Sequence, residues 1–155
     1  MSNTKAISAF EANHIGTEDL PWFPYFGEAK LKLIKANPVT GQFITLLKVP
    51  AAMQLPAHFH PGQVTVYTIQ GAWRYIENDW ISRTGDVVCE PAGSKHTPEA
   101  VGDEDVITLN IVDGTLDYLG ENDEIIARDN WESVLNKYHA YCETEGIEPE
   151  DLTKY

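Results

Sequence analysis

The feature that most constrains the fold of this chain is a series of short β-rich runs separated by glycines. Apolar and polar residues alternate from Ala29 onward, and the run 42–49 lies between Gly41 and Pro50. The same pattern predicts strands over 64–70, 72–77, 86–89 and 106–112, and a weaker one over 124–127. Turns are predicted at the glycines 71, 85, 93, 102, 114 and 120. Many short strands joined by such turns predict an all-β sandwich or barrel.

One helix is predicted near the end of the chain. Asp129 or Asn130 is a suitable N-cap, apolar residues follow at helical spacing as far as Tyr141, and Gly146 is a suitable end. A chain of 155 residues is too short for two comfortable domains. We therefore expect an arm over 1–20, a barrel over 21–128, and a helix with an acidic tail packed on the barrel over 129–155.

The charge balance restricts the partners of the protein. Eleven basic and twenty-four acidic residues give a formal charge of −13, which repels nucleic acid and anionic membrane surfaces. No secretory leader and no apolar run of membrane-spanning length is visible, so we expect a cytoplasmic protein. Cys89 and Cys142 lie in no paired motif, and Cys89 is expected to be a buried, inert thiol.

Three of the five histidines stand in the predicted barrel. His58 and His60 are two residues apart on a strand entry, so their imidazoles leave the same face and can converge on one ion. A second segment reads G-x5-P-x-G-x2-H from Gly85, and its turn presents His96 as the next strand begins. His14 in the arm and His139 in the helix are expected at the surface.

Together these two segments resemble the two signatures of the cupin family. The second signature is matched at four of its five fixed positions, with Ala100 in place of the usual Asn. The first, G-x5-H-x-H-x3,4-E-x6-G, is met by the two histidines and Gly71, but Ala52 replaces its opening Gly and Val64 its Glu. The resemblance implies a single-domain RmlC-like jelly-roll barrel with a C-terminal helix, and one divalent metal bound by His58, His60 and His96.

The residue at Val64 changes the expected charge of this site. Without the usual carboxylate, three neutral histidines leave the metal its full double charge and several open positions, which favours an anionic, chelating ligand. Gln63 would supply an amide oxygen only if the strand bulges. Val64 and Gln63 are therefore both candidate pocket residues.

Among three-His cupins, the chain resembles the 2,4′-dihydroxyacetophenone dioxygenase-like group, a relative of acetylacetone dioxygenase. The resemblance rests on the stretches 58–62, 67–75, 79–80 and 90–97. It implies a non-haem Fe(II) enzyme that uses O2 to cleave a carbon–carbon bond beside a carbonyl, in a small diketone or hydroxyketone. Zn(II) or Ni(II) are alternative metals.

Several further side chains are candidates for catalysis or for the pocket. Glu90 is expected to orient a ligand histidine, to act as a base, or to be only a solvent-exposed rim carboxylate. Arg74 either pairs with Glu90, grips an anionic substrate, or is an ordinary surface residue. Tyr67 and Trp73, with Tyr75 and Trp80, are expected as core and pocket wall.

Two other functions remain open from the residues. One is a non-catalytic zinc-binding cupin that acts as a sensor or binding module, like the cupin half of some anti-sigma factors; the other is a metal-dependent isomerase or lyase. The expected partners are a small carbonyl substrate and O2. A homo-oligomer, either dimer or tetramer, is expected through sheet edges and the aromatic segment 21–26, which otherwise plugs the rim of the core.

Overall fold

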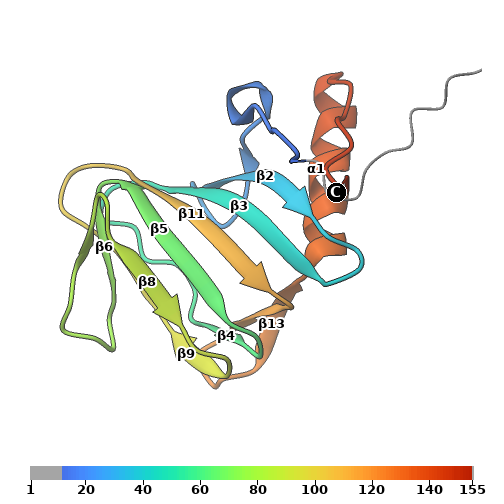
Figure 1. Ribbon diagram of the computed structural model, residues 1–155. Coiled ribbons are helices and arrows are strands. Elements are labelled where there is room, and N and C mark those ends of the chain that lie inside the picture. The colour runs from blue at the N-terminus through green and yellow to red at the C-terminus, as the bar shows by residue number, and fades with distance from the viewer. Residues whose placement is uncertain (1–11, 155) are drawn as a thin grey trace, which may run out of the picture.

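The computed structural model describes residues 12–154, which form a β-barrel with one C-terminal α-helix. The largest sheet has the order β1 (Phe23–Pro24), β2 (Lys30–Ala36), β3 (Gln42–Val49), β11 (Val106–Asp113), β5 (Val64–Gln70) and β8 (Val87–Glu90). A second sheet has the order β13 (Ile125–Asp129), β12 (Leu116–Leu119), β4 (His58–His60) and β9 (Ser94–His96). A third has the order β10 (Pro98–Val101), β6 (Ala72–Tyr75) and β7 (Ser82–Arg83). The predicted all-β architecture is confirmed (Figure 1).

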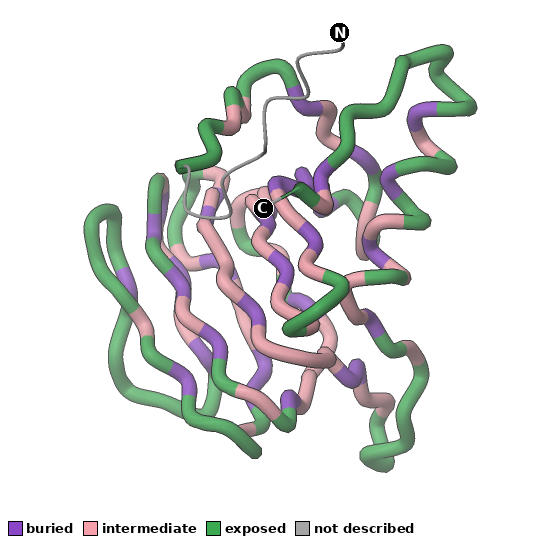
Figure 2. The backbone as a smooth tube through the Cα atoms, turned by 45° about the vertical axis from the view of Figure 1, so that its right-hand side comes forward, coloured by how far each residue is buried: buried purple, intermediate pink, exposed green. Residues whose placement is uncertain are grey.

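Alternation along the strands separates a barrel interior from an outer face (Figure 2). In β5, Val64 and Val66 are buried, while Tyr67 and Ile69 are 42% and 40% exposed. Since successive side chains of a strand point to opposite faces, Tyr67 lies outside the barrel. The expectation that Tyr67 forms a pocket wall is therefore corrected.

The helix α1 (Trp131–Glu145) has the predicted cap residues at both ends. The Asn130 side chain accepts a hydrogen bond from the Ser133 backbone nitrogen, and the Ser133 hydroxyl accepts one from the Asn130 backbone nitrogen, which completes a capping box. At the other end, Gly146 terminates the helix with its backbone in the left-handed region at φ 67°. Val134 and Tyr138 lie on its buried face, and the helix packs beside β2 (Figure 1). The helix thus covers one side of the barrel.

The aromatic N-terminal segment lies against this helix and the barrel. A short 3-10 helix (Thr17–Asp19) precedes it, and Phe23 is buried with its ring 6.2 Å from that of Tyr141. Tyr25 donates a 2.7 Å hydrogen bond to the Asp129 carboxylate and also contacts the Tyr118 hydroxyl. The segment therefore ties the helix to the barrel wall.

Some features differ from the expectations. The strands β7, β10 and β12 were not predicted, because each has only two to four residues and lacks a clear apolar alternation. Cys89 is exposed, so the expectation of a buried thiol there is wrong; Cys142 is the buried one.

Within residues 12–154, no helix has both the length and the apolar character needed to cross a membrane.

Candidate metal centre

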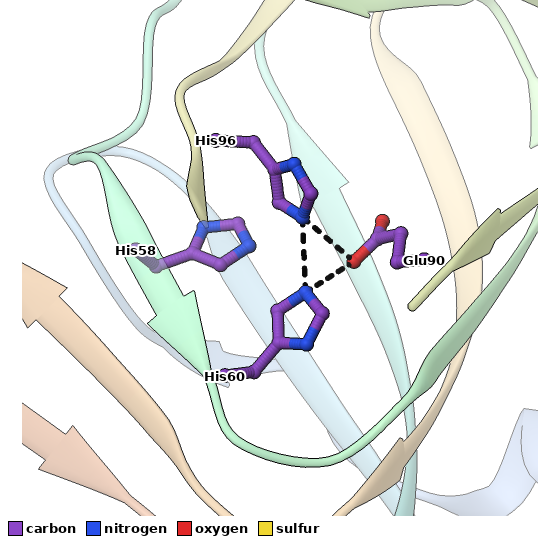
Figure 3. A group of neighbouring side chains, drawn as sticks. All are labelled: His58, His60, Glu90 and His96. Carbon is purple, nitrogen blue, oxygen red and sulfur yellow. Dashed lines mark hydrogen bonds and ion pairs between the residues drawn. The ribbon is translucent and has the colours of Figure 1, made fainter. Parts of the chain in front are cut away.

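Four side chains from three strands converge at one end of the barrel (Figure 3). His58 and His60 come from β4, His96 from β9 and Glu90 from the end of β8. In the register of the strands His58 lies opposite His96, and Glu90 lies opposite Val64. One potential ligand atom from each of the four residues lies within 4.8 Å of the others.

The closest approaches are between ring nitrogens and one carboxylate oxygen. Nε2 of His60 lies 3.0 Å from Nε2 of His96 and 2.9 Å from Oε2 of Glu90. The distance from His96 Nε2 to the same oxygen is 3.5 Å. His58 completes the group, with its ring centroid 5.8 Å from that of His60 and 5.4 Å from that of His96. Nitrogen and oxygen donors therefore face a common point.

The backbone around Gly62 fixes the orientation of His60. Nδ1 of His60 lies 2.7 Å from the Gly62 carbonyl oxygen, which can only accept, so Nδ1 carries the hydrogen. The lone pair of the neutral ring is then on Nε2, toward the cluster. A Cβ atom at Gly62 would lie 1.9 Å from the Asp113 carbonyl oxygen, so this close approach requires glycine.

Tyr75 supports the other side of the cluster. Its hydroxyl donates a hydrogen bond to Oε1 of Glu90, and its ring stacks on His96 at 4.1 Å between centroids. Because Oε1 is engaged by Tyr75, Oε2 is the oxygen directed at the histidines. Tyr75 itself packs against Trp73 and Trp80.

Burial and hydrogen bonding set the charges of the group. Burial alone would raise the pKa of Glu90, but its close contacts with the His60 and His96 imidazoles and the hydrogen bond from Tyr75 outweigh burial and lower the pKa to about 2. Burial would lower the pKa of His60, yet its contacts with Glu90 and Gly62 raise it. Burial dominates at His58 and lowers its pKa to about 4. At neutral pH the group holds an ionised carboxylate and a neutral His58.

These residues fit a divalent metal ion. Oε2 of Glu90 is buried and accepts no well-aligned hydrogen bond from the described residues, although it faces two imidazoles. An ionised buried carboxylate needs a compensating positive charge. Three imidazoles and one carboxylate are donors that Fe(II), Zn(II) and Ni(II) accept. His58, His60, Glu90 and His96 could therefore hold one metal ion.

This arrangement corrects the expected charge of the site. A neutral three-His set was expected because Val64 occupies the usual position of the carboxylate. Instead, Glu90 reaches the cluster from the strand paired with β5, directly across from Val64, and it is buried rather than at a solvent-exposed rim. Contact between Glu90 and a ligand histidine was one of the predicted alternatives, but its place as a fourth potential donor was not predicted, because strand register is not readable from the linear spacing.

A largely apolar cavity of about 100 Å³ lies inside the barrel beside the cluster. His58 and Glu90 line it, together with Val64 and Trp73. Gln63, by contrast, is exposed, and its carbonyl oxygen accepts a hydrogen bond from the Asp113 backbone nitrogen. Of the four predicted pocket residues, Val64 and Trp73 therefore face the cavity, whereas Tyr67 and Gln63 do not.

The structure places Arg74 away from the cluster. Its guanidinium forms an ion pair with Glu99 at 2.8 Å, and its side chain is 43% exposed. Trp73 and Tyr75 on either side of it in β6 are buried, so Arg74 projects to the opposite face. Of the three alternatives for Arg74, the structure therefore excludes the pairing with Glu90 and agrees with an ordinary surface residue. His14 and His139 are exposed and likewise lie outside the cluster.

A second, more open hollow of about 530 Å³ lies on the other side of the cluster. His96, Trp80 and Cys89 line it, together with Tyr75 and Glu90, which also line the inner cavity. The Tyr75–Glu90 pair thus separates the apolar interior from the outer hollow.

A barrel of this kind with histidines from β4 and β9 at one end defines a cupin. The family model of the ChrR cupin-like domain matches residues 11–117, and the chain belongs to this family. None of the curated proteins compared with the chain matches it significantly.

Solved structures extend this likeness. An RmlC-like cupin protein from Ralstonia eutropha JMP134 is 44% identical, with a TM-score of 0.88 over 93% of this chain and 95% of its own. An acetylacetone dioxygenase from Acinetobacter johnsonii is 18% identical, with a TM-score of 0.72, and the match covers 86% of this chain and 93% of the dioxygenase chain. A chain from the complex of Rhodobacter sphaeroides SigE with the anti-sigma ChrR is 26% identical, with a TM-score of 0.54, and the match covers 62% of this chain and 51% of that one.

Proposed function

We propose that the protein is a mononuclear non-haem Fe(II) dioxygenase that cleaves a carbon–carbon bond in a small diketone or hydroxyketone. The observation that carries the proposal is that the His58/His60/Glu90/His96 cluster adjoins the apolar cavity. The cluster provides donors for a metal ion, and the cavity provides a water-excluding space for a small ligand. The fold likeness to acetylacetone dioxygenase supports the proposal at the level of architecture.

The residues of the chain have separate tasks in this proposal. Bound iron would supply the one-electron chemistry that reaction with O2 requires. His60 is held in one tautomer by the Gly62 carbonyl group, and Glu90 is held ionised with one oxygen directed at the histidines. Side chains such as Val64 and Trp73 exclude water from the space in which the carbonyl compound binds.

Oxygen uptake tests the proposal. Protein loaded anaerobically with Fe(II) is mixed with O2 and a panel of diketones and hydroxyketones, and the products are identified by mass spectrometry. We expect uptake of one O2 for each molecule cleaved with at least one member of the panel. His58→Ala should lose this activity, while His139→Ala, which changes an exposed histidine on α1, should keep it. No uptake above that of free Fe(II) would contradict the proposal.

A second candidate function is a zinc-holding binding module. Membership of the ChrR cupin-like family and the likeness to a chain of the SigE–ChrR complex favour it. Four protein donors can also form the closed tetrahedral site that is typical of structural zinc. Stoichiometric zinc in protein from iron-supplemented cells, together with no O2 uptake by the iron-loaded form, would favour this function over the dioxygenase.

A further inference from the structure

One stretch of the cavity wall is polar although its surroundings are apolar. In β11 the inward positions are Val106, Thr108, Asn110 and Val112, and all four line the cavity. Across the ladder Asn110 pairs with Thr45 of β3, which lines the cavity as well. Asn is unfavourable in strands, and an amide facing an apolar interior is costly unless it is hydrogen-bonded.

The hydrogen bonds of Asn110 leave capacity for a ligand. Its described partners are all on Thr108: Nδ2 donates to Oγ1 at 3.1 Å and to the carbonyl oxygen at 3.3 Å, and the Thr108 hydroxyl lies 3.3 Å from Oδ1. These distances are at or beyond the long end of the usual range. A primary amide offers two donors and two lone pairs, so it can still bind a further group.

The hydroxyl groups of the two tyrosines in this wall are already engaged. Tyr25 and Tyr118 also line the cavity, but their hydroxyls contact each other, and Tyr25 donates to Asp129. Asp129 in turn contacts Lys137 at 2.6 Å. The Asn110–Thr108 pair is therefore the better candidate for recognising a ligand.

The position of Asn110 relative to Glu90 defines the length of such a ligand. Asn110 pairs with Val66 of β5, and Val66 pairs with Val88 of β8, two residues from Glu90. Two strand spacings separate β11 from β8, which is roughly 10 Å measured at the backbone. A molecule held at the cluster by one end can therefore present its other end to Asn110.

We propose that Asn110 and Thr108 form a second binding point of the cavity, which accepts a neutral hydrogen-bonding group at the end of the substrate away from the metal. The group is neutral because the pair carries no charge and the surrounding wall is apolar. The inference rests on the proposed function. A binding point at this position would favour carbonyl substrates with two separated polar ends over simple diketones.

Two related ligands test this binding point without turnover. Zinc-loaded protein, which has no redox chemistry, is titrated calorimetrically with 1-phenylbutane-1,3-dione and with its 4-hydroxyphenyl analogue. We expect the hydroxyl group to tighten binding about three- to tenfold, as one neutral hydrogen bond does. In Asn110→Leu and in Thr108→Val the two ligands should bind within about twofold of each other.

The controls separate the possible failures. Asn136→Leu, on the exposed face of α1, should keep the preference of the unmodified protein. Both variants must retain affinity for the phenyl compound, and Thr108→Val provides an independent arm if Asn110→Leu does not fold. A preference that persists in both variants, or is absent from the unmodified protein, overturns the inference alone. If neither ligand binds the metal-loaded protein, both the inference and the proposed function are contradicted.

Discussion

Glu90 supplies the negative charge that distinguishes this cluster from three neutral imidazoles. Glu90→Gln keeps the shape of the side chain but removes its charge, and we expect the affinity for Zn(II) to fall at least tenfold, since loss of even a supporting group around a metal costs 10- to 100-fold. Glu99→Gln is the matched control, because Glu99 lines the same cavity but pairs with Arg74. Competition with a chromophoric chelator measures the affinity, and an equal effect of both variants would contradict the assignment.

The lowered pKa of His58 predicts how the stability of the metal-free protein depends on pH. Its pKa is about 4 in the folded protein, against an ordinary value of 6.5 for histidine, so the unfolded chain binds more protons than the folded one between these values. The free energy of unfolding should therefore decrease as the pH falls from 6.5 to 4, by up to about 3 kcal/mol. The raised pKa of His60 acts above pH 6.5, and the lowered pKa of Glu90 acts below about 4.5.

Urea unfolding in the presence of a chelator measures this dependence. His58→Asn removes the titrating ring and should flatten the curve between pH 6.5 and 4.5. His139→Asn changes an exposed histidine and should leave the curve unchanged. Equal slopes in the unmodified protein and in His58→Asn would contradict the role given to burial of His58.

Ala52 occupies the position at which the first cupin signature has glycine, and its backbone is in the left-handed region at φ 61°. This conformation costs a residue with a Cβ atom about 1 kcal/mol, and glycine avoids that strain. Ala52→Gly should therefore raise the free energy of unfolding slightly, by about 0.5 kcal/mol after the added chain entropy of glycine. Thermal unfolding measures the change, and a marked loss of stability would contradict it.

At the scale of elements, the cap of α1 was visible in the sequence and can be tested directly. Asn130 bonds the backbone nitrogen of Ser133, so Asn130→Ala should lower the free energy of unfolding by about 1 kcal/mol. Asn136→Ala, at an exposed position within the helix, should be neutral or slightly stabilising. Urea unfolding compares the two, and equal effects would exclude a capping role.

The longer strands were predictable for the same reason as the helix. The runs 42–49 and 64–70 coincide with β3 and β5, because each has an apolar pattern bounded by Gly or Pro. β12 was missed, although Tyr118 in it lies directly opposite His58. Its four residues, Leu116–Leu119, include the buried Asp117, so their pattern does not separate an inner from an outer face.

At the scale of the whole molecule, motif spacing singled out three histidines that the structure brings together on the paired strands β4 and β9, but it could not predict which residues face one another across the other strand pairs. The pairing of β5 with β8 brings Glu90 opposite Val64, and that of β3 with β11 brings Thr45 opposite Asn110. Both are contacts between residues far apart in the sequence. The division into arm, barrel and tail and the expected homo-oligomer stay predictions.

The number of metal ions bound per chain tests the central claim most directly. After loading with Fe(II) or Zn(II) and removal of excess metal, elemental analysis should find one ion per chain in the unmodified protein. Single alanine substitutions of His58, His60 or His96 should lower this number toward zero, whereas His14→Ala and His139→Ala should leave it at one. No retained metal in the unmodified protein, or full retention after loss of a cluster histidine, would contradict the account.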